Sequence, residues 1–382
     1  MTGLCAYLGA DIHDGARRVA DQALLVEGGR IVGIVPDVPE GAEVTRLEGG
    51  VIAPGLVDLQ VNGGGGVMFN DDPSVDTLRV MARAHIGLGA TAILPTLITD
   101  APPHSRAAID AVEAAIAQGV AGIAGLHLEG PHLSVARKGA HDPSLIRAMG
   151  DGDLEMLCAA AARLPVLKMT LAPEAVTPEQ IRALTGAGVL VSLGHSDAGF
   201  DACVAAVEAG AACATHLFNA MSQLGNREPG LVGAVLAEGR LSAGLIADGV
   251  HVHPATIRAA MAAKTGPGRI FLVSDAMSVA GSEQQAFTLN GREIRRAGGR
   301  LTLENGTLAG ADLDLPTAIH NLAAWGICDR DHALAMATSI PAELIGAGDF
   351  GHLRPGARAD FIHLAADGLR AVWKDGTRIG QG

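Results

Sequence analysis

Short apolar segments alternate with alanine-rich helical segments through the middle of this chain, from about residue 55 to about residue 345. One unit of the pattern runs TAILPTL, SRAAIDAVEAAIAQG and AGIAGLHLEG. Repeated β-then-α units at this spacing predict parallel strands joined by crossover helices. The strand segments are apolar throughout, as expected for strands buried on both faces. The pattern therefore predicts an α/β fold, a distorted (β/α)8 TIM-like barrel.

The two ends of the chain carry a different pattern of short strands and turns. The first fifty residues include ALLVEGGRIVGIVPD, and the last thirty include ADFIHLA and LRAVWKDG. Chain termini often lie close together, so these ends can pair. A barrel commonly takes about 250 residues or more, which leaves room for one small extra domain in 382 residues. We expect a small β-sandwich domain from residues 1–53 and 350–382, and a catalytic barrel from residues 54–349.

One segment inside the barrel region departs from the alternation. Residues 286–310 contain few helix formers and carry Asn-Gly pairs that begin at Asn290 and Asn305. Asn-Gly favours the tight turns of β-hairpins. We expect hairpins inserted after the strand that ends at Asp275, where they could form part of a wall over a substrate.

The composition excludes several classes of protein. Hydrophobic residues make up 48% of the chain and charged residues 18%, which is typical of a well-buried globular protein. The net charge of −13 disfavours nucleic acid and anionic membranes as partners. The five cysteines never form CxxC, which argues against a disulfide framework or a zinc finger. The N-terminus lacks a signal sequence, and no apolar stretch reaches about 18 residues, so we expect a cytoplasmic protein.

Four apolar segments each end in a residue that can bind a metal or move a proton. These residues are Glu129, His195, His216 and Asp275. In a parallel barrel, catalytic groups come from the carboxyl ends of several strands, which open onto one mouth. Catalytic zinc is typically held by three His, Asp or Glu ligands, with water in the open position. Glu129, His195 and His216 fit that set, and Asp275 is the natural general base beside it.

Structural explanations compete with these assignments. A lone polar residue at a strand end often caps the backbone, and an aspartate there often caps the next helix. The joint occurrence of four such residues at successive strand ends favours the metal site. His127 shares a face with Glu129, but a hydrogen-bonded core histidine is the better interpretation. His132 and His253 are equally ambiguous, so none of these three is assigned to the metal.

Two cationic residues follow the strands of the predicted site. Arg227 lies in SQLGNREPGLVG, a few residues beyond His216, and His251 follows GLIADG. Either could overhang the barrel mouth, and arginine binds phosphate oxygens well. Simple exposure to solvent is the competing explanation for both.

The chain resembles the N-acetylglucosamine-6-phosphate deacetylases, a family within the amidohydrolase superfamily. The resemblance rests on APGLVDLQVNG, HLEGPHLSVARKGAHDP, LGHSDA, THLFNAMSQLGNREPGLVGA, ADGVHV and LVSDA, in that order. It covers nearly the whole chain, and its motifs are specific in combination. It implies hydrolysis of N-acetyl-D-glucosamine 6-phosphate to D-glucosamine 6-phosphate and acetate, in amino-sugar catabolism and recycling.

The resemblance also implies roles for individual residues. It places one divalent metal per subunit on Glu129, His195 and His216, and the acid-base function on Asp275. The metal expected is zinc, with iron, manganese or cobalt as alternatives. The histidine of KGAHDP, His141, matches one that contacts the substrate near the scissile acetamide, where it could polarise the carbonyl.

The remaining implied contacts concern the sugar phosphate. Asn219 and the backbone of Ala220 match residues that touch it, while Arg227 and His251 match its cationic binders. The family is commonly homodimeric, and part of the phosphate pocket can come across the interface. Local cations of this kind would let a protein with a charge of −13 bind a phosphate monoester.

Two departures affect these expectations. Many amidohydrolases carry His-x-His at the end of the first barrel strand for a second metal, and this chain has Gln60 and Asn62 there. Amides are weak, neutral ligands beside imidazole, so we expect one tightly bound metal. In TLAGADLDL, Ala311 stands where the resemblance predicts serine. If that loop lines the sugar pocket, the preference for one hexose over another is open.

Three alternative functions remain. The nearest is the same chemistry on N-acetylgalactosamine 6-phosphate. Another is a dihydroorotase-like cyclic-amide hydrolase, which normally uses His-x-His and a carboxylated lysine. Lys168 is the only strand lysine near a suitable position, and it sits early in its strand. The third is a non-catalytic scaffold, which retention of all four strand-end residues opposes. The sequence leaves the native metal, the oligomeric state and the source of the substrate open.

Overall fold

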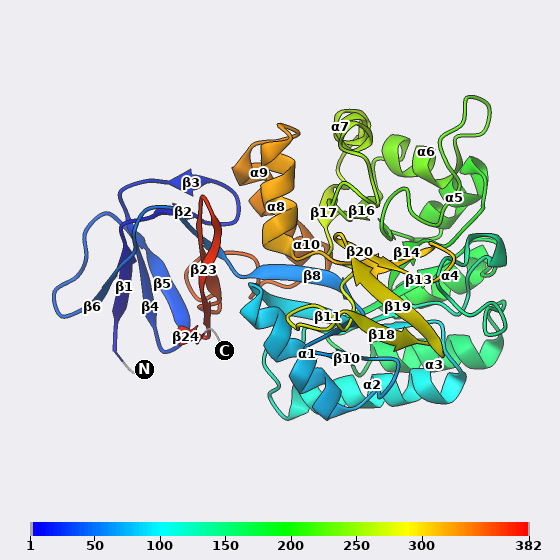
Figure 1. The fold of residues 1–382 in the computed structure, drawn as a ribbon, viewed down its shortest axis with the longest axis horizontal. Coiled ribbons are helices and arrows are strands. Elements are labelled where there is room, and N and C mark those ends of the chain that lie inside the picture. Colours follow the sequence, from blue (N-terminus) through cyan, green and yellow to red (C-terminus); the bar gives the residue numbers. More distant parts are fainter. Residues whose placement is uncertain (1–2, 381–382) are drawn as a thin grey trace.

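The structure is a computed structural model that describes residues 3–380, and its centre is a barrel of eight parallel strands (Figure 1). Each strand pairs in parallel with its neighbours in chain order, which confirms the predicted (β/α)8 barrel. The eight strands are β8 (Leu56–Val61), β11 (Ala90–Ile98), β12 (Leu126–Glu129), β13 (Leu167–Leu171), β14 (Leu190–Leu193), β15 (Cys213–Ala214), β16 (Ser242–Leu245) and β17 (Ile270–Leu272).

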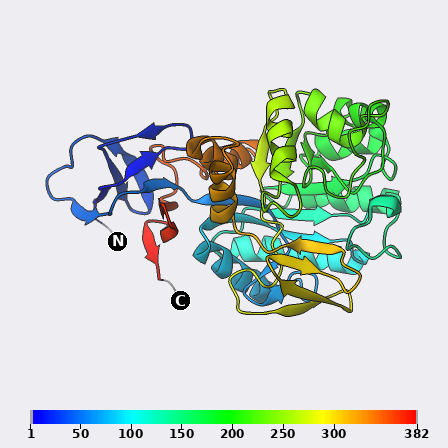
Figure 2. The same ribbon diagram turned by 45° about the horizontal axis from the view of Figure 1, so that its top comes forward.

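Helices surround the barrel strands (Figure 2). In the first of them, α1, the apolar residues Leu78, Met81, Ala82 and Ile86 are buried, at the spacing of one helix face. Several helices begin at a side-chain cap, such as Ser74, which accepts a hydrogen bond from the Thr77 amide. The helices are α1 (Val75–Gly87), α2 (Pro102–Ala117), α3 (Asp151–Ala161), α4 (Pro178–Gly186), α5 (Phe200–Glu208), α6 (Gly230–Ala237), α7 (Pro254–Ala263), α8 (Leu315–Ala324), α9 (Arg330–Ala337) and α10 (Ser339–Leu344), with a 3-10 turn at Val135–Arg137.

The barrel interior is more polar than the apolar strand segments suggested. His127 on β12 bonds through its two ring nitrogens to the hydroxyls of Thr96 and Thr170, at 3.1 and 2.7 Å. The Thr170 hydroxyl in turn bonds to that of Thr215, which bonds to Ser192, each at 2.7 Å. Buried polar groups are tolerated when they satisfy one another in this way. The interpretation of His127 as a hydrogen-bonded core histidine is confirmed.

A small β-sandwich is built from both ends of the chain, on the left of Figure 1. One sheet has the strand order β5-β4-β1-β6, and the other has the order β24-β23-β22-β7-β2-β3, so the last three strands of the chain join strands from its beginning. We keep domain boundaries at 53/54 and 349/350 as a proposal. The strands are β1 (Cys5–Leu8), β2 (Asp11–His13), β3 (Arg18–Val19), β4 (Ala23–Glu27), β5 (Arg30–Val35), β6 (Glu43–Arg46), β7 (Val51–Pro54), β22 (Phe361–Ala365), β23 (Gly368–Lys374) and β24 (Thr377–Ile379).

Aromatic rings from both termini meet in the core between these two sheets. The ring of Phe361 stacks on Trp373 at a centroid distance of 4.6 Å and meets Tyr7 edge-on at 4.9 Å. All three residues are buried in one apolar cluster. Aromatic pairs of this kind add to the stabilisation that burial alone provides. The sandwich therefore depends on contacts between residues more than 350 positions apart.

The predicted hairpin insertion is confirmed and lies beside the barrel mouth, gold in Figure 1. It is an antiparallel sheet of β18 (Ala286–Leu289), β19 (Arg292–Ala297), β20 (Arg300–Thr302) and β21 (Leu308–Ala311). Asn290 and Gly291 both have positive φ, at 51° and 74°, as the predicted Asn-Gly turn requires. A further pair of short strands, β9 (Gly63–Gly64) and β10 (Val67–Met68), follows β8.

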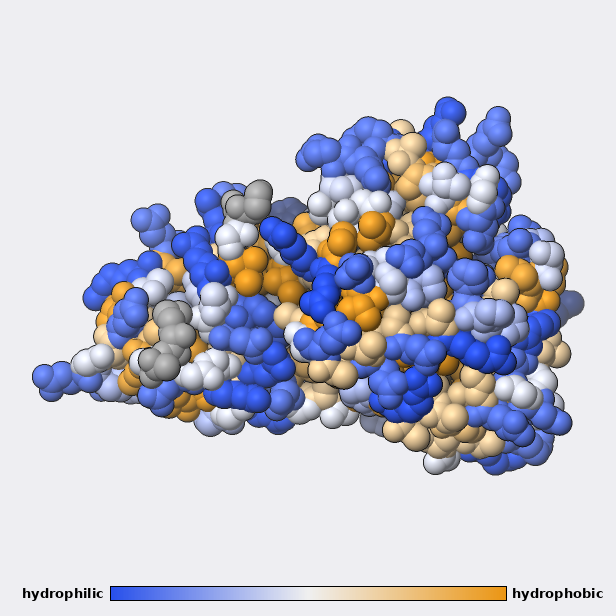
Figure 3. Space-filling view, turned by 90° about the horizontal axis from the view of Figure 1, so that it is seen from below, coloured by the Kyte–Doolittle hydropathy of each residue, from blue (hydrophilic) through white to orange (hydrophobic). Residues whose placement is uncertain are grey.

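The surface is mostly hydrophilic on the face shown in Figure 3, where small apolar patches are scattered among polar residues. Large exposed hydrophobic side chains, such as Val32, Val80 and Leu224, come from separate elements of the described chain. Scattered apolar residues of this kind are ordinary for a globular protein. None of the described helices combines the length and the apolarity needed to cross a bilayer.

The aromatic core of the sandwich predicts how the replacement of one of its side chains by alanine changes stability. Phe361→Ala should lower the free energy of unfolding by about 3–5 kcal/mol, because the variant loses buried area and leaves a cavity between the sheets. Val32→Ala, at a side chain that is 43% exposed, is the control and should change stability by less than about 0.5 kcal/mol. Chemical denaturation followed by circular dichroism measures both. Equal stability of the two variants would contradict the packing described for this core.

Candidate metal centre and active site

The carboxyl ends of the barrel strands surround a cavity of about 400 Å³ that gathers most of the predicted site residues. Glu129 is the last residue of β12, while His195 and His216 stand two residues beyond β14 and β15. Asp275 stands three residues beyond β17. Parallel strands deliver such residues to one edge of the barrel, as the sequence pattern predicted.

Three of these side chains form a tight triangle. The Glu129 Oε1 atom lies 3.2 Å from His195 Nε2 and 3.1 Å from His216 Nε2, and the two nitrogens are 3.1 Å apart. Each of the three residues is at most 5% exposed. In a tetrahedron with metal-ligand bonds of about 2.0–2.2 Å, ligand atoms lie roughly 3.4 Å apart. The spacing of these three atoms therefore fits a tetrahedral divalent metal.

The electrostatics of the triangle suit a cation. Burial would raise the pKa of Glu129, but its contacts with His195 and His216 outweigh burial and hold that pKa well below its usual range. The carboxylate is therefore ionised. His195 Nδ1 lies 2.9 Å from the Arg137 carbonyl oxygen, which can only accept a hydrogen bond, so this nitrogen carries the proton. The lone pair of His195 Nε2 then faces Glu129 and His216, as a metal ligand requires.

The backbone at three of the strand ends is strained. His195, His216 and Asp275 have φ values of +46°, +29° and +50°, in the left-handed region that residues other than glycine rarely adopt. Such a conformation costs on the order of 1–3 kcal/mol and persists only where the surrounding structure holds it. Strain of this kind gathers at functional sites, and here it turns three side chains inward over the same cavity.

His141 lies against the triangle. Its ring centroid is 4.3 Å from that of His195, and its Nδ1 bonds to the Thr99 hydroxyl at 2.7 Å. Burial and the nearby His195 hold the pKa of His141 well below its usual range, so the ring is neutral. Ligand atoms of Glu129, His141 and His195 lie within 4.8 Å of one another, which makes His141 an alternative third ligand. The shorter distances to His216 favour His216 instead.

Asn62 lines the cavity, but the side-chain amides of Gln60 and Asn62 are hydrogen-bonded to the carboxylates of the site. The Asn62 amide donates to Asp275 Oδ1 at 2.8 Å, and the Gln60 amide donates to the same oxygen at 3.1 Å. Gln60 also donates to both oxygens of Glu129 at 3.3 Å. Because the amide nitrogens point at carboxylates, the pair restrains Asp275 in the place where other amidohydrolases are expected to bind a second metal.

Asp275 itself has the properties of a buried base. Burial, followed by the negative charge of Glu129, raises the pKa of this carboxyl. The hydrogen bond from Asn62 opposes that increase. A carboxylate with a raised pKa is better suited to take up and return a proton near neutral pH. Two amide donors on one of its oxygens leave the other oxygen for that role.

Asn219, Ala220 and His251 line the same cavity. His251 Nδ1 lies 2.6 Å from the Asp248 carboxylate, which orients the ring. The Asn219 amide donates to the carbonyl oxygens of His216 and Leu217, which fixes this residue to the loop that carries His216. These three residues therefore stand where a second part of a ligand could be held.

Arg227 is not brought into the cavity. It lies in the exposed loop between Met221 and α6, close in sequence to Leu224, which is 59% exposed. Within the described chain, this loop does not contribute to the lining of the cavity. Arg227 can therefore act on a ligand bound here only through a movement of the loop or from a second copy of the chain.

The hairpin insertion supplies lining residues that the motifs did not identify. Leu289 and the segment 306–310 line the cavity, as do Met277 and Ile98. The predicted wall over the mouth is thus confirmed, but its apolar members carried no signal beyond the Asn-Gly turns. Ala311 is buried, its amide donates to the Asp275 carbonyl oxygen at 2.9 Å, and it does not line the cavity.

Three other residues considered from the sequence have structural contacts. His132 Nδ1 bonds to the Arg147 carbonyl oxygen at 3.1 Å, and His253 caps α7 by accepting from the Ala255 amide. Lys168 is buried early in β13, with its Nζ 3.5 Å from the Leu59 carbonyl oxygen, and it does not line the cavity. The carboxylated-lysine chemistry of a dihydroorotase gains no support from this position.

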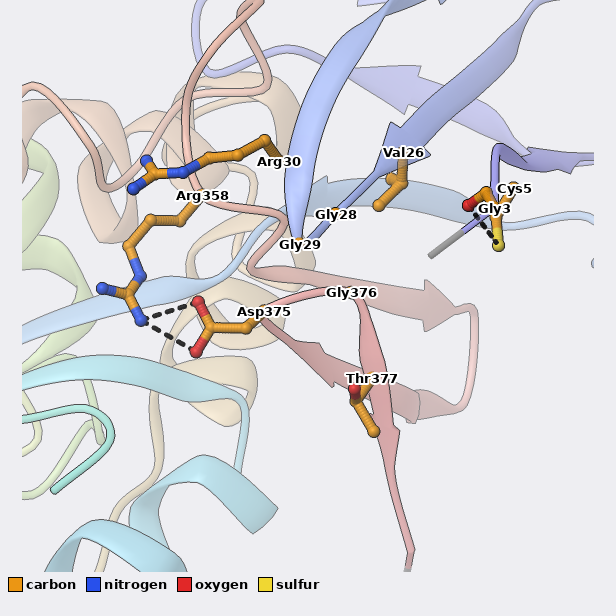
Figure 4. Close-up of a pocket in the computed structure, with 10 residues that line it drawn as sticks. All are labelled: Gly3, Cys5, Val26, Gly28, Gly29, Arg30, Arg358, Asp375, Gly376 and Thr377. Carbon is orange, nitrogen blue, oxygen red and sulfur yellow. Dashed lines mark hydrogen bonds and ion pairs between the residues drawn. The ribbon is translucent and has the colours of Figure 1, made fainter. Parts of the chain in front are cut away.

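A second cavity, of about 510 Å³, lies in the β-sandwich (Figure 4). It is lined by the Gly28-Gly29 turn and by Arg30, Arg358 and Asp375. Arg358 Nη2 donates to both oxygens of Asp375, at 2.6 and 2.8 Å, so its charge is already balanced. Within residues 3–380, the only group of three metal-ligand side chains found is the one in the barrel cavity.

Comparison with known proteins agrees with this geometry. The model of the amidohydrolase family matches residues 51–379. The N-acetylgalactosamine-6-phosphate deacetylase of Shewanella sp. (strain ANA-3) is 45% identical over 88% of this chain and 85% of its own. The N-acetylglucosamine-6-phosphate deacetylase of Haemophilus influenzae is 35% identical over 86% of each chain.

A solved structure is similarly close. The crystal structure of N-acetylglucosamine-6-phosphate deacetylase from Pasteurella multocida superposes with a TM-score of 0.94 at 34% identity. The match covers 99% of this chain and 100% of that one. The family match and these relatives extend over both the barrel and the strands that the chain ends contribute to the sandwich. The chain belongs to the amidohydrolase family.

Proposed function

We propose that this protein hydrolyses the acetamide of N-acetyl-D-glucosamine 6-phosphate, releasing D-glucosamine 6-phosphate and acetate, in amino-sugar catabolism and recycling. The observation that carries the proposal is the buried triangle of Glu129, His195 and His216 next to the amide-restrained Asp275, in one cavity. Relatives whose names describe this activity, at 35% identity and above over most of the chain, support it.

The residues of the cavity divide the chemistry among them. Glu129, His195 and His216 would hold one divalent metal per subunit, which supplies Lewis acidity for the acetamide carbonyl and the attacking water. We assign zinc to this site, with iron, manganese or cobalt as alternatives, because a carboxylate and two imidazoles suit it. Neutral His141 donates a hydrogen bond to the carbonyl oxygen as negative charge develops there.

Asp275 acts as the general base and then as the general acid. It takes a proton from the attacking water and then delivers it to the nitrogen of the departing amine. Gln60 and Asn62 hold one carboxylate oxygen during both transfers, at 3.1 and 2.8 Å in the structure. Because its side chain is already held in place, this base loses little rotational freedom when it reacts.

The phosphate is bound at the other end of the cavity. Asn219, the Ala220 backbone and His251 line this cavity, and we assign them to the phosphate from the same chain. We propose that the protein is a homodimer and that Arg227 reaches the phosphate pocket of the partner subunit. The exposure of Arg227 outside its own cavity and of Leu224 beside it supports that arrangement. Localisation in the cytoplasm, where sugar phosphates are found, is part of the same proposal.

The galacto epimer is a second candidate substrate. The Shewanella relative named for N-acetylgalactosamine 6-phosphate is 45% identical to this chain, against 35% for the Haemophilus relative named for the gluco sugar. The two sugars differ only in the configuration of one hydroxyl. Both would place the acetamide and the phosphate against the same residues, so the chemistry proposed above applies to either.

An acetate-release assay tests the proposed function. The panel contains N-acetylglucosamine and N-acetylgalactosamine, each with and without the 6-phosphate, and metal content is measured on the same enzyme. We expect the 6-phosphates to be hydrolysed and the unphosphorylated sugars to react poorly. The ratio of kcat/KM for the two phosphates decides between the epimers. Metal-loaded protein that releases acetate from none of the four would refute the proposal.

Substitutions separate the base from the metal ligands. Asp275→Asn should retain the metal and lower kcat about 10²- to 10⁴-fold, because general acid-base catalysis contributes about that much. His195→Ala should lose both metal and activity, because two ligands bind a divalent ion poorly. Steady-state kinetics with metal analysis measures both effects. Near-full activity of Asp275→Asn would contradict the assignment of the base.

A second substitution tests the phosphate contact. Arg227→Ala should raise KM for the phosphorylated sugar about 10- to 100-fold, because hydrogen bonds to a charged group are worth about 1.5–3 kcal/mol. KM for the unphosphorylated sugar should change little. Arg182→Ala, at an exposed arginine paired with Glu179, is the matched control. Equal effects of Arg227→Ala on both sugars would remove Arg227 from the phosphate site.

A further inference from the structure

The first and last strands of the barrel, β8 and β17, are not joined by a strand ladder like the other neighbours. At the carboxyl end of β8, the Asp275 amide donates to the Gln60 carbonyl oxygen at 3.1 Å, and the Asn62 amide donates to that of Ala276 at 2.8 Å. Below these bonds, the Asp58 side chain crosses the seam. Both oxygens of its carboxylate accept from the Ser274 amide, at 3.2 and 3.3 Å.

Asp58 is an unusual residue with which to close a barrel. It is 1% exposed, and no ion pair with it is found within the described chain, although the buried Lys168 lies near enough for the Asp58 charge to oppose the fall that burial causes in the pKa of Lys168. A buried carboxylate without a directly paired cation is costly unless hydrogen bonds compensate. Burial raises its pKa to about 7, and the bonds from Ser274 and Gln60 oppose that increase. A buried carboxylate at the junction of β8 and β17 therefore indicates that Asp58 does more than fill space in the core.

The bonds of Asp58 end on the residues that hold Asp275. Ser274 directly precedes Asp275, whose φ of +50° needs restraint from its neighbours. The other amide bound by Asp58, at 3.2 Å, belongs to Gln60, whose side chain donates to Asp275 Oδ1. One carboxylate thus fixes both the backbone before the base and the strand that carries its amide donor.

We propose that Asp58 is a positioning residue that holds Asp275 in its left-handed conformation, with its carboxylate directed at the reacting atoms. The inference rests on the proposed role of Asp275 as the base. Without Asp58, the backbone at Ser274 loses an acceptor, and Asp275 is free to relax toward an extended conformation. Displacement of a catalytic group by about 1 Å can cost on the order of 100-fold in rate.

The test compares Asp58→Asn with a matched buried carboxylate. Asparagine keeps the shape of Asp58 but replaces one of the two oxygens that accept from the Ser274 amide with a donor, so a single oxygen remains for the amides of Ser274 and Gln60. Asp360→Asn is the control for a buried carboxylate outside the site: Asp360 accepts from the Asp375 amide at 2.8 Å in the sandwich and, unlike Asp58, is also ion-paired with Lys374 and Arg358. Asp58→Asn should lower kcat about 10- to 100-fold with KM and metal content nearly unchanged. Asp360→Asn should lower stability and leave kcat unchanged.

A double variant distinguishes positioning of the base from other effects. If Asp58 acts through Asp275, adding Asp58→Asn to Asp275→Asn should lower kcat no further. An equal loss in both backgrounds, or full activity of Asp58→Asn beside an inactive Asp275→Asn, would overturn the inference and leave the proposed function intact. Full activity of Asp275→Asn would instead refute the base itself.

Folding of the variants is tested in the same series. Asp58→Ser keeps one hydroxyl acceptor in a smaller side chain, and it should show the same selective loss of kcat if Asp58→Asn does not fold. A crystal structure of either variant should show Asp275 with a changed φ. Failure of both variants to fold would indicate a purely structural role for Asp58 and would contradict the inference.

Discussion

The Glu129 carboxylate, enclosed between the imidazoles of His195 and His216, is the interaction on which the rest of the site depends. A carboxylate that is only 2% exposed is costly to ionise, and its pKa is low only because two ring nitrogens lie 3.1 and 3.2 Å away. The strained strand ends, the Arg137 carbonyl oxygen and the Gln60 amide all serve to keep these atoms facing one another. A divalent cation at their centre would complete the balance of charge.

The amide pair at Gln60 and Asn62 gives the site its particular character. In place of imidazoles that could bind a second cation, the chain presents two neutral donors to a single oxygen of Asp275. Neutral donors add no charge, so they restrain the base without competing for the metal. Asp58 extends the same arrangement to the backbone, since it binds the amides of Gln60 and Ser274. The first and last barrel strands thus meet at Asp275, the proposed acid-base group.

The sequence predicts those features that follow from the regular alternation of strands and helices. Apolar segments end at Glu129, His195, His216 and Asp275. The parallel strands of a barrel bring such ends together regardless of the conformations of the loops. The Asn-Gly pairs likewise predicted the hairpins. His127 was predicted as a hydrogen-bonded core histidine, but its hydroxyl partners were not predicted, because threonine and serine within an apolar strand give no periodic signal.

Other features depend on three-dimensional context that no local pattern contains. The left-handed backbone at the strand ends is uncommon for any residue other than glycine, so nothing in the local sequence around these histidines and this aspartate predicts it. Asp58 resembles any strand residue until the barrel closes and places it opposite Ser274, which is 216 residues away. Arg227 is cationic in sequence, but it lies outside the cavity of its own chain, and its proposed role requires a second subunit that the sequence of one chain does not specify.

The central claim is that one metal is held by the triangle and that the amide pair holds none. Crystals of the metal-loaded protein, measured at the absorption edge of the bound metal, test it directly through anomalous scattering. The account predicts one peak per chain, within about 2.0–2.2 Å of Glu129, His195 and His216. A second peak coordinated by Gln60 and Asn62, or a triangle without a peak, would contradict it.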